Sequence, residues 1–270
     1  MMTLRKFASR TGDNGIPLPS LYSSWEKNQV TFRRGSTSMI AGTPGTYKSI
    51  LALNMAAQWA LKGHSILYFS ADSDESVVAR RMAGILTGDK ATDIECRIQE
   101  NPGYYEGALS KLGDLRFAYD SRLTVTGVRD YLAAWETVYG EYPEIIVIDN
   151  LINFAEYPDD WAAMLVVIRD MDDIARETGA HACILHHAKI RSGKKEQDEG
   201  WPPADWEISG KVTQLSRLVL TLAAEDQSLY WSVVKNTTGK QDRQARMRHG
   251  MDVEDSLRIR DTGYLSYKGD

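Results

Sequence analysis

A glycine-containing turn between a short apolar strand and a helix limits this chain to few folds. Residues 38–41 predict a buried strand, and residues 49–62 carry apolar side chains at helical spacing and end at Gly63. Between them, residues 42–49 read Gly-Thr-Pro-Gly-Thr-Tyr-Lys-Ser. The backbone N–H groups of such a turn and the N-terminus of the following helix point at one place, which favours a bound phosphate. The three segments together predict a phosphate-binding loop.

Two side chains of this loop carry the expected chemistry. Lys48 would reach the β- and γ-phosphates of ATP, and the Ser49 hydroxyl would ligate Mg²⁺. Tyr47 stands where glycine is expected, and a non-glycine residue at positive φ costs roughly 1 kcal/mol. Three alternatives stay open: a coincidental turn, a loop that binds nucleotide but hydrolyses it poorly, and a Tyr47 side chain packed outside the phosphate cradle. The candidate nucleotide-binding residues are Gly42, Thr43, Pro44, Gly45, Thr46, Tyr47, Lys48 and Ser49.

Polar residues follow three other apolar segments. Residues 145–148 form a continuous apolar strand that ends in Asp149, where a carboxylate would orient Mg²⁺ together with Ser49. Asp72 follows the strand predicted over residues 66–69. His186, with His187 beside it, ends the strand predicted from residue 182. Because the carboxyl ends of parallel strands line the ligand crevice, one of the two histidines is expected to be functional.

Strands and helices alternate along most of the chain, which predicts an α/β fold with a mostly parallel sheet and antiparallel strands at the C-terminal edge. Further helices are predicted over residues 73–86, 125–139 and 161–178, and a further strand over residues 115–119. Residues 89–113 are polar and irregular in pattern. Two adjacent strands are expected at 218–222 and 229–234, and a last hairpin over 258–265 that turns at Thr262-Gly263. Residues 1–34 are interpreted as an arm or loosely packed lead-in, and residues 35–270 as one ATPase domain.

Composition excludes some classes of protein. The formal net charge of -5 rules out a basic surface over the whole molecule, so nucleic acid would have to bind through local basic loops. Two isolated cysteines form neither a disulfide framework nor a zinc site. With no signal peptide and no membrane-length apolar run in view, we expect a cytoplasmic protein without a membrane partner, in the host cytoplasm if a phage encodes it.

The phosphate-binding loop, the strand ending in Asp149 and the His186-His187 pair resemble the RecA-like P-loop ATPases, in particular the DnaB-type and RepA-type hexameric replicative helicases of phages and plasmids. An aromatic residue before the loop lysine is familiar in that branch. The resemblance implies that Asp72 is the catalytic carboxylate that polarises the attacking water, with Asp74 and Glu75 as alternatives. It also implies that His186 senses the γ-phosphate.

The same resemblance implies contacts outside the nucleotide site. Residues 206–214 resemble the loop and helix that face DNA in these helicases. The candidate nucleic-acid residues are Lys189, Arg191, Lys194, Lys195 and Lys211. A solvated loop is the alternative.

Residues 233–240 resemble the strand end whose Lys and Arg reach the ATP of a neighbouring subunit. Lys235 matches the lysine, but Thr237 replaces the arginine. Lys240 or Arg243 is therefore a substitute candidate for this finger in trans. A solvated basic turn is the alternative.

The expected function is that of an ATP- and Mg²⁺-dependent helicase or translocase on single-stranded DNA in replication. The expected assembly is a homo-oligomer, either a ring such as a hexamer or a filament, that contacts other replication or recombination proteins. Two alternatives stay open. One is a recombination mediator or strand-annealing ATPase, and the other is a nucleotide-gated helicase loader or scaffold with weak hydrolysis.

Overall fold

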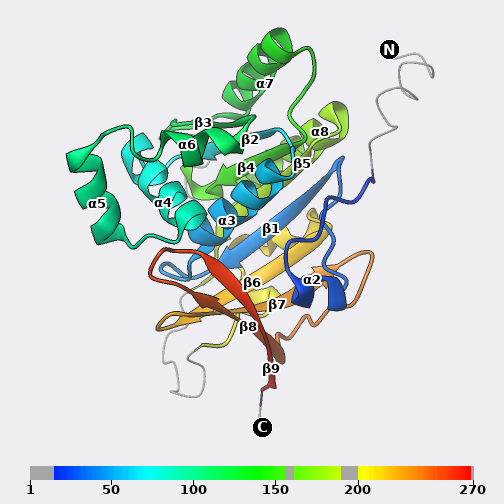
Figure 1. Cartoon of the computed structure of the whole chain (residues 1–270). Helices are drawn as coiled ribbons and strands as arrows, with labels where there is room; N and C mark the ends of the chain where they lie inside the picture. Colours follow the sequence, from blue (N-terminus) through cyan, green and yellow to red (C-terminus); the bar gives the residue numbers. More distant parts are fainter. Residues whose placement is uncertain (1–14, 156–160, 190–199, 269–270) are drawn as a thin grey trace.

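A nine-stranded sheet runs through the part of the chain that the computed structural model describes, residues 15–155, 161–189 and 200–268. Its order is β3-β2-β4-β5-β1-β6-β7-β8-β9 (Figure 1). The parallel strands are β1 Ser36–Gly42, β2 Ile66–Ser70, β3 Leu115–Ala118, β4 Ile145–Asp149, β5 His181–His187 and β6 Leu218–Glu225. The antiparallel strands are β7 Ser228–Asn236, β8 Met247–Val253 and β9 Ile259–Tyr267. The predicted fold class is confirmed.

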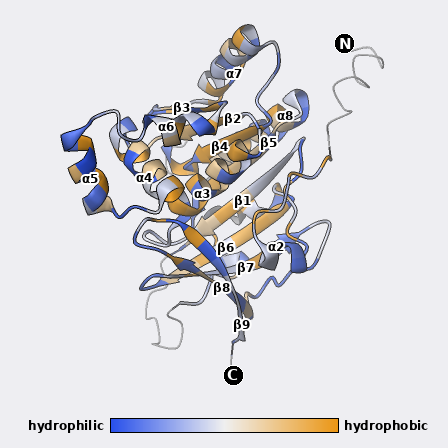
Figure 2. Ribbon diagram, in the orientation of Figure 1, coloured by the Kyte–Doolittle hydropathy of each residue, from blue (hydrophilic) through white to orange (hydrophobic). Residues whose placement is uncertain are grey.

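Helices cover both faces of the parallel strands, which explains why these strands are apolar without alternation (Figure 2). One face packs against α3 Lys48–Leu61 and α4 Glu75–Thr87. The other face packs against α7 Val125–Tyr139 and α8 Trp161–Thr178. The strands present alternate residues to the two cores, so neighbouring side chains at a strand end point to opposite faces.

Capping residues set the bounds of the predicted helices. The Asp74 carboxylate accepts a 2.9 Å hydrogen bond from the Val77 amide, which makes it the N-cap of α4. The Thr124 hydroxyl accepts from the Gly127 amide at 2.8 Å at the start of α7. Both helices end at a glycine with positive φ. No helix among the described residues is both long and apolar enough to cross a membrane.

The interpretation of residues 89–113 as irregular was wrong. They contain the helices α5 Ala91–Glu100 and α6 Glu106–Leu109 and the 3₁₀ turn η1 Ser110–Leu112. Ile94 and Tyr105 pack with Ala83 of α4 in a small separate core, and the Tyr105 hydroxyl donates to Asp89 at 2.9 Å. So few apolar positions give a weak helical pattern in the sequence, and tertiary packing supplies the rest.

The prediction of a hairpin turning at Thr262-Gly263 was also wrong. Residues 259–267 form the single strand β9, which pairs with β8, a strand that the sequence pattern did not reveal. The register shifts opposite Gly250, where the Thr262 hydroxyl donates to the Gly250 carbonyl at 2.7 Å and Gly263 has a φ of +68°. A Thr-Gly pair fits this bulge as well as it fits a turn.

The described part of the lead-in packs against the body of the molecule. It contains the short helix α2 Ser23–Lys27, and the Trp25 side chain is 1% exposed among the aromatic rings of Phe32 and Trp231. The Trp59 indole of α3 donates to the Pro19 carbonyl at 3.0 Å. Residues 15–34 are thus not loosely packed, although the division at residue 34 itself stays a prediction.

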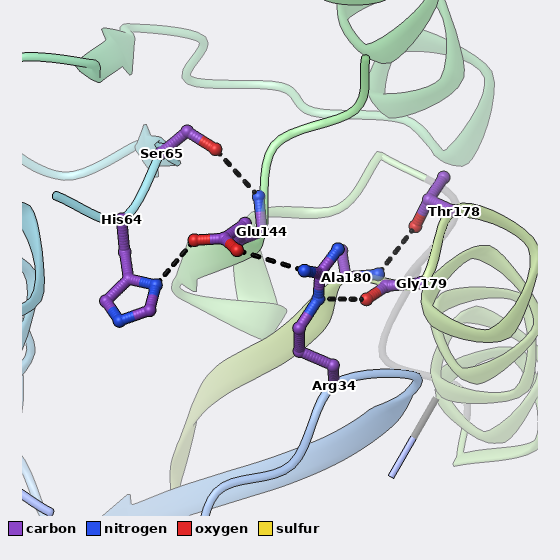
Figure 3. A network of polar contacts seen from close by, with 7 residues as sticks. All are labelled: Arg34, His64, Ser65, Glu144, Thr178, Gly179 and Ala180. Atoms are coloured by element: carbon purple, nitrogen blue, oxygen red, sulfur yellow. Dashed lines mark hydrogen bonds and ion pairs between the residues drawn. The ribbon is translucent and has the colours of Figure 1, made fainter. Parts of the chain in front are cut away.

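A polar network joins the segments that precede β1, β2 and β4 (Figure 3). It lies at the amino ends of these strands, whereas the phosphate-binding loop follows the carboxyl end of β1. The Glu144 carboxylate, just before β4, accepts from the Arg34 guanidinium at 2.9 Å and contacts His64 Nδ1 at 2.5 Å. Arg34 also donates to the Gly179 carbonyl after α8 at 2.9 Å, and the Ser65 hydroxyl accepts from the Glu144 amide at 3.1 Å. The amino ends of β1, β2 and β4 therefore share one set of contacts.

Candidate functional site

The phosphate-binding loop, residues 42–49, joins β1 to α3 with a backbone that only small residues allow at its start. A Cβ atom on Gly42 would lie 2.5 Å from the Thr46 hydroxyl and 2.8 Å from the Leu222 carbonyl. Gly45 has a φ of +82°. The Thr46 hydroxyl donates to the Thr43 carbonyl at 2.8 Å and closes the turn. The loop thus curls in front of the N-terminus of α3, where amide groups favour phosphate.

Tyr47 adopts the positive φ expected of it, 57°, and its side chain points out of the loop. The ring packs against the core on the α3 face, and its hydroxyl donates to the Asp226 carbonyl in the β6–β7 turn at 3.0 Å. These contacts offset the backbone strain of a left-handed residue. The Tyr47 side chain therefore does not fill the place that a phosphate would take.

Lys48 lies inside the cradle that the loop forms. Its ammonium group donates to the Gly42 carbonyl at 3.0 Å and to the Thr43 carbonyl at 2.8 Å, and the residue is 8% exposed. Burial lowers the pKa of Lys48 to about 8, an effect that the negative charges of Asp149 and Asp72 partly offset. The buried cation lies where a bound phosphate would supply the missing negative charge.

The two candidate Mg²⁺ ligands meet at the start of α3. The Ser49 hydroxyl donates to Asp149 Oδ1 at 3.0 Å, and the Tyr68 hydroxyl of β2 donates to Asp149 Oδ2 at 2.9 Å. Burial raises the pKa of Asp149, while the hydrogen bonds from Ser49 and Tyr68 lower it. Hydroxyl and carboxylate oxygens beside a phosphate cradle fit Mg²⁺, which binds few protein ligands and keeps waters. No group of three or more His, Cys, Asp or Glu side chains that could hold a metal occurs in the described ranges.

Asp72 stands beside Asp149, because β2 and β4 are neighbours and Ser70 pairs with Asp149. Its carboxylate is exposed and accepts hydrogen bonds from Asn150 Nδ2 at 2.8 Å and Asn153 Nδ2 at 2.9 Å. Tyr68, Asn150 and Asn153 were not among the residues predicted from the sequence. The available signals were the Tyr68 hydroxyl within the apolar strand 66–69, the Asn150 amide directly after Asp149, and the Asn153 amide three residues further on.

The two histidines at the end of β5 point to opposite faces. His186 is 2% exposed on the α8 face, and its Nε2 contacts the Ser209 carbonyl at 2.9 Å. Burial lowers the pKa of His186 to about 4, so its ring is neutral near pH 7 and Nε2 carries the donated proton. His187 lies on the α3 face next to Gly42, its partner in β1. Burial, and then the positive charge of Lys48, lower the pKa of His187.

The candidate finger cations are not equally placed. Lys235, in β7, donates to the Thr213 and Gln214 carbonyls at 2.7 and 2.8 Å, at the end of the 3₁₀ helix η5 Ser209–Gln214. Arg243 forms a 2.8 Å ion pair with Asp205, the first residue of η4 Asp205–Glu207. Both cations line a cavity of about 490 Å³ with Trp206 and Gln241. Lys240 is exposed.

The candidate nucleic-acid residues can be placed only in part. Lys189 is exposed two residues after the end of β5, and its amide donates to the Glu207 carbonyl at 2.8 Å. Lys211 belongs to η5, so the expected loop and helix of residues 206–214 is a pair of 3₁₀ turns, η4 and η5. Arg191, Lys194 and Lys195 lie outside the described residues.

The sheet order and the loop between β1 and α3 are those of the RecA-like P-loop ATPase fold. The chain belongs to the AAA domain family, which it matches over residues 15–193. It is 28% identical over 280 residues to the Gene 65 protein of Mycobacterium phage L5, covering 98% of this chain and 100% of that protein. The Gene 65 protein of Mycobacterium phage D29 is 30% identical over 216 residues, covering 76% of this chain and 89% of that protein.

Solved structures share the fold at low sequence identity. A DnaB-like replicative helicase, studied with its primase interactions, superposes with a TM-score of 0.77 at 14% identity over 95% of this chain, which spans 64% of that helicase. A separately solved ATPase domain gives a TM-score of 0.76 at 14% identity, covering 96% of this chain and 95% of that domain. The KaiC-like protein PH0186 of Pyrococcus horikoshii gives 0.59 at 15% identity, with 92% and 98% covered.

Proposed function

We propose that this protein hydrolyses ATP to move along, or to separate the strands of, nucleic acid as a replicative-type helicase or translocase on single-stranded DNA. The observation that carries the proposal is one cluster of side chains, in which Lys48, the Ser49–Asp149 pair and Asp72 lie together at the carboxyl ends of β1, β4 and β2. The DnaB-like architecture of the fold supports a motor, and the likeness to phage proteins supports a phage origin.

Each residue of this cluster has a distinct role in the proposed reaction. Loop amides and the Lys48 ammonium bind the β- and γ-phosphates. Ser49 and Asp149 would hold Mg²⁺, which would neutralise phosphate charge. Asp72 accepts a proton from the water that attacks the γ-phosphate, which the exposure of its carboxylate permits.

The two histidines divide the sensing of nucleotide between them. His187 faces Lys48 and Asp72, so we assign the contact with the γ-phosphate to its ring, whose Nδ1 has no hydrogen-bond partner among the residues that the structure describes. His186 donates to the Ser209 carbonyl and so connects the same strand end to η5. In this assignment His186, expected as the sensor, transmits a movement that His187 detects.

The position of the remaining cations supports an assembly of like subunits. Lys235 and Arg243 lie beyond β6, on the antiparallel side of the sheet, and Lys48 is the cation of the loop itself. A ring or filament would bring Lys235, Lys240 or Arg243 of one subunit to the γ-phosphate of the next. Single-stranded DNA would then contact Lys189, Lys211 and the basic residues 191, 194 and 195 of several subunits at once.

A nucleotide-gated scaffold or loader is the second candidate. It is favoured by one observation: Lys235 and Arg243 are both engaged by their own chain. A subunit that kept these contacts after assembly would bind ATP and hydrolyse it slowly.

The deciding experiment measures ATP turnover with and without single-stranded DNA over a range of protein concentrations. We expect DNA to stimulate turnover, activity per subunit to rise with concentration, and Lys48→Ala to abolish hydrolysis. A strand-displacement assay with a labelled fork then separates a helicase from an annealing ATPase. Turnover that DNA does not change would favour the scaffold, and wild-type turnover by Lys48→Ala would refute the proposed site.

A further inference from the structure

The candidate catalytic carboxylate accepts hydrogen bonds from two side-chain amides of the segment that follows the neighbouring strand β4. Asp72 Oδ2 accepts from Asn150 Nδ2 at 2.8 Å, and Asp72 Oδ1 accepts from Asn153 Nδ2 at 2.9 Å. Both asparagines follow β4, and Asn153 ends the 3₁₀ turn η2 Leu151–Asn153. Two donors on two different oxygens define the plane of a carboxylate, which one donor does not.

We propose that Asn150 and Asn153 are positioning residues that orient Asp72 toward the attacking water. This inference rests on the proposed function, in which Asp72 accepts the proton of that water. Asp72 belongs to an exposed turn between β2 and α4, and its side chain is shorter than that of glutamate. A short carboxylate on such a turn needs an external support to keep one direction.

The chemical nature of the donors fits this role. An arginine or lysine in the same place would neutralise the carboxylate and weaken it as a base. Neutral amides hold both oxygens and leave the negative charge in place. Each carboxylate oxygen has two lone pairs, so a second acceptor site on each oxygen is left for water after the two amides have bound.

Asn150 is itself well fixed. Asn150 is 5% exposed, and its Oδ1 accepts from the Ile152 amide at 3.0 Å, which caps η2. The Ala71 amide donates to the Asp149 carbonyl at 3.0 Å, so the ends of β2 and β4 stay joined. Because Asn150 directly follows Asp149, the Mg²⁺ ligand and the support of the base are consecutive residues.

The first test is a double-mutant cycle on ATP turnover by the full chain. We expect Asn153→Ala to lower kcat roughly tenfold at unchanged KM for ATP, since orientation of the base matters mainly in the transition state. Asn101→Ala is the matched control, because Asn101 caps an exposed turn elsewhere through its Oδ1. In an Asp72→Asn background, adding Asn153→Ala should cost nothing further. A purely structural Asn153 would lower activity equally in both backgrounds, which would overturn the inference.

The second test uses an isosteric change. Asn150→Asp keeps the oxygen that accepts from the Ile152 amide but replaces the donor to Asp72 by a second carboxylate. Like charge disfavours the ionised base, so the acid limb of the pH profile of kcat should move to higher pH. An unchanged limb would contradict direct contact with a base. If Asp72→Asn itself hydrolyses ATP normally, the assignment of the base fails. If Asp72→Asn is inactive but Asn153→Ala has wild-type kcat, only the support fails.

Discussion

At the scale of single residues, the phosphate-binding loop combines a strained backbone with a buried cation. Tyr47 accepts a left-handed backbone because its ring and hydroxyl find partners outside the loop. Lys48 accepts burial because the Gly42 and Thr43 carbonyls and two nearby carboxylates compensate for lost water. Because the Tyr47 side chain lies outside the loop and the Lys48 ammonium lies inside it, the cradle stays open and positively charged, as phosphate binding requires.

The low pKa of Lys48 predicts how ATP binding depends on pH. With a pKa of about 8, the lysine is charged at pH 7 and largely neutral at pH 9 when no nucleotide is bound. Because bound phosphate needs the charged form, the affinity for Mg-ATP should fall roughly tenfold between pH 7 and pH 9. Titration with a fluorescent ATP analogue at each pH measures this. Lys48→Ala should bind weakly without this decline, and an equal decline in both proteins would contradict the prediction.

His181 predicts how the stability of the fold depends on pH. Its ring contacts the Arg33 carbonyl and the Ser38 hydroxyl at 2.8 and 2.9 Å, and burial lowers the pKa of His181 from 6.5 to about 4. The unfolded chain therefore takes up a proton first as the pH falls below 6.5, so stability is complete above that pH and is lost toward pH 4.

This loss can be separated from that of other groups. Between pH 7 and pH 5 it amounts to about 2 kcal/mol for a shift of this size. Urea unfolding of the wild type and of His181→Asn at both pH values measures it. The variant should be less stable at pH 7 but should lose about 2 kcal/mol less on acidification. If both proteins lose the same amount, another group controls the acid transition.

At the scale of elements, the two ends of the parallel strands carry different features, the candidate nucleotide site and a stabilising polar network. The carboxyl ends of β1, β2, β4 and β5 carry the candidate nucleotide site, while the amino ends of β1, β2 and β4 share the Glu144 network. The two sets lie at opposite ends of the same strands. Stability and chemistry can therefore be changed independently.

Glu144→Gln tests this separation. The change removes the charge that Arg34 and His64 share in a site where all three side chains are 15–29% exposed, so we expect a loss of about 1–2 kcal/mol. Calorimetry should show a lower Tm with unchanged affinity for ATP. The control is Glu177→Gln in the exposed Arg129–Glu177 pair, which should change stability by less than about 0.5 kcal/mol. Equal effects in the two variants would mean that the network is no stronger than a surface pair.

The η4–η5 segment, residues 205–214, contacts side chains of two strands, β5 and β7. His186 of β5 contacts its Ser209 carbonyl, and Lys235 of β7 contacts the carbonyls at its end. A cation at the last carbonyls of a helical turn is favourable. A change at either strand end would therefore alter the position of this segment.

At the scale of the whole molecule, the proposed ring completes each nucleotide site with a second subunit. We expect Lys48→Ala subunits mixed with Lys240→Ala or Arg243→Ala subunits to recover ATPase activity that neither has alone, since an intact loop then meets an intact finger. A finger in trans contributes roughly 10³-fold or more, so partial recovery is measurable. Steady-state turnover of the mixtures, with each variant alone as the control, is the measurement. Absence of recovery in every mixture would mean that the site is completed within one chain.

The agreement between pattern and fold depends on how local each signal is. Residues 38–62 and 145–149 contain strand, turn and helix signals within a few positions, so the loop, Lys48, Ser49 and Asp149 were predictable. α5 and β8 were not, because their few apolar residues gain meaning only when distant segments pack against them.

The amino-acid order alone was enough for the class of fold and for the nature of the phosphate chemistry, because both depend on short-range periodicity and on one contiguous loop. The remaining features needed the folded chain. Tyr68 contacts Asp149, and Asn150 and Asn153 contact Asp72, across 78 to 81 positions of sequence. Lys235 of β7 contacts the Thr213 carbonyl of η5, which precedes β6 in the chain. Such contacts depend on strand order and on which face each side chain takes, and neither is set by neighbours in the sequence.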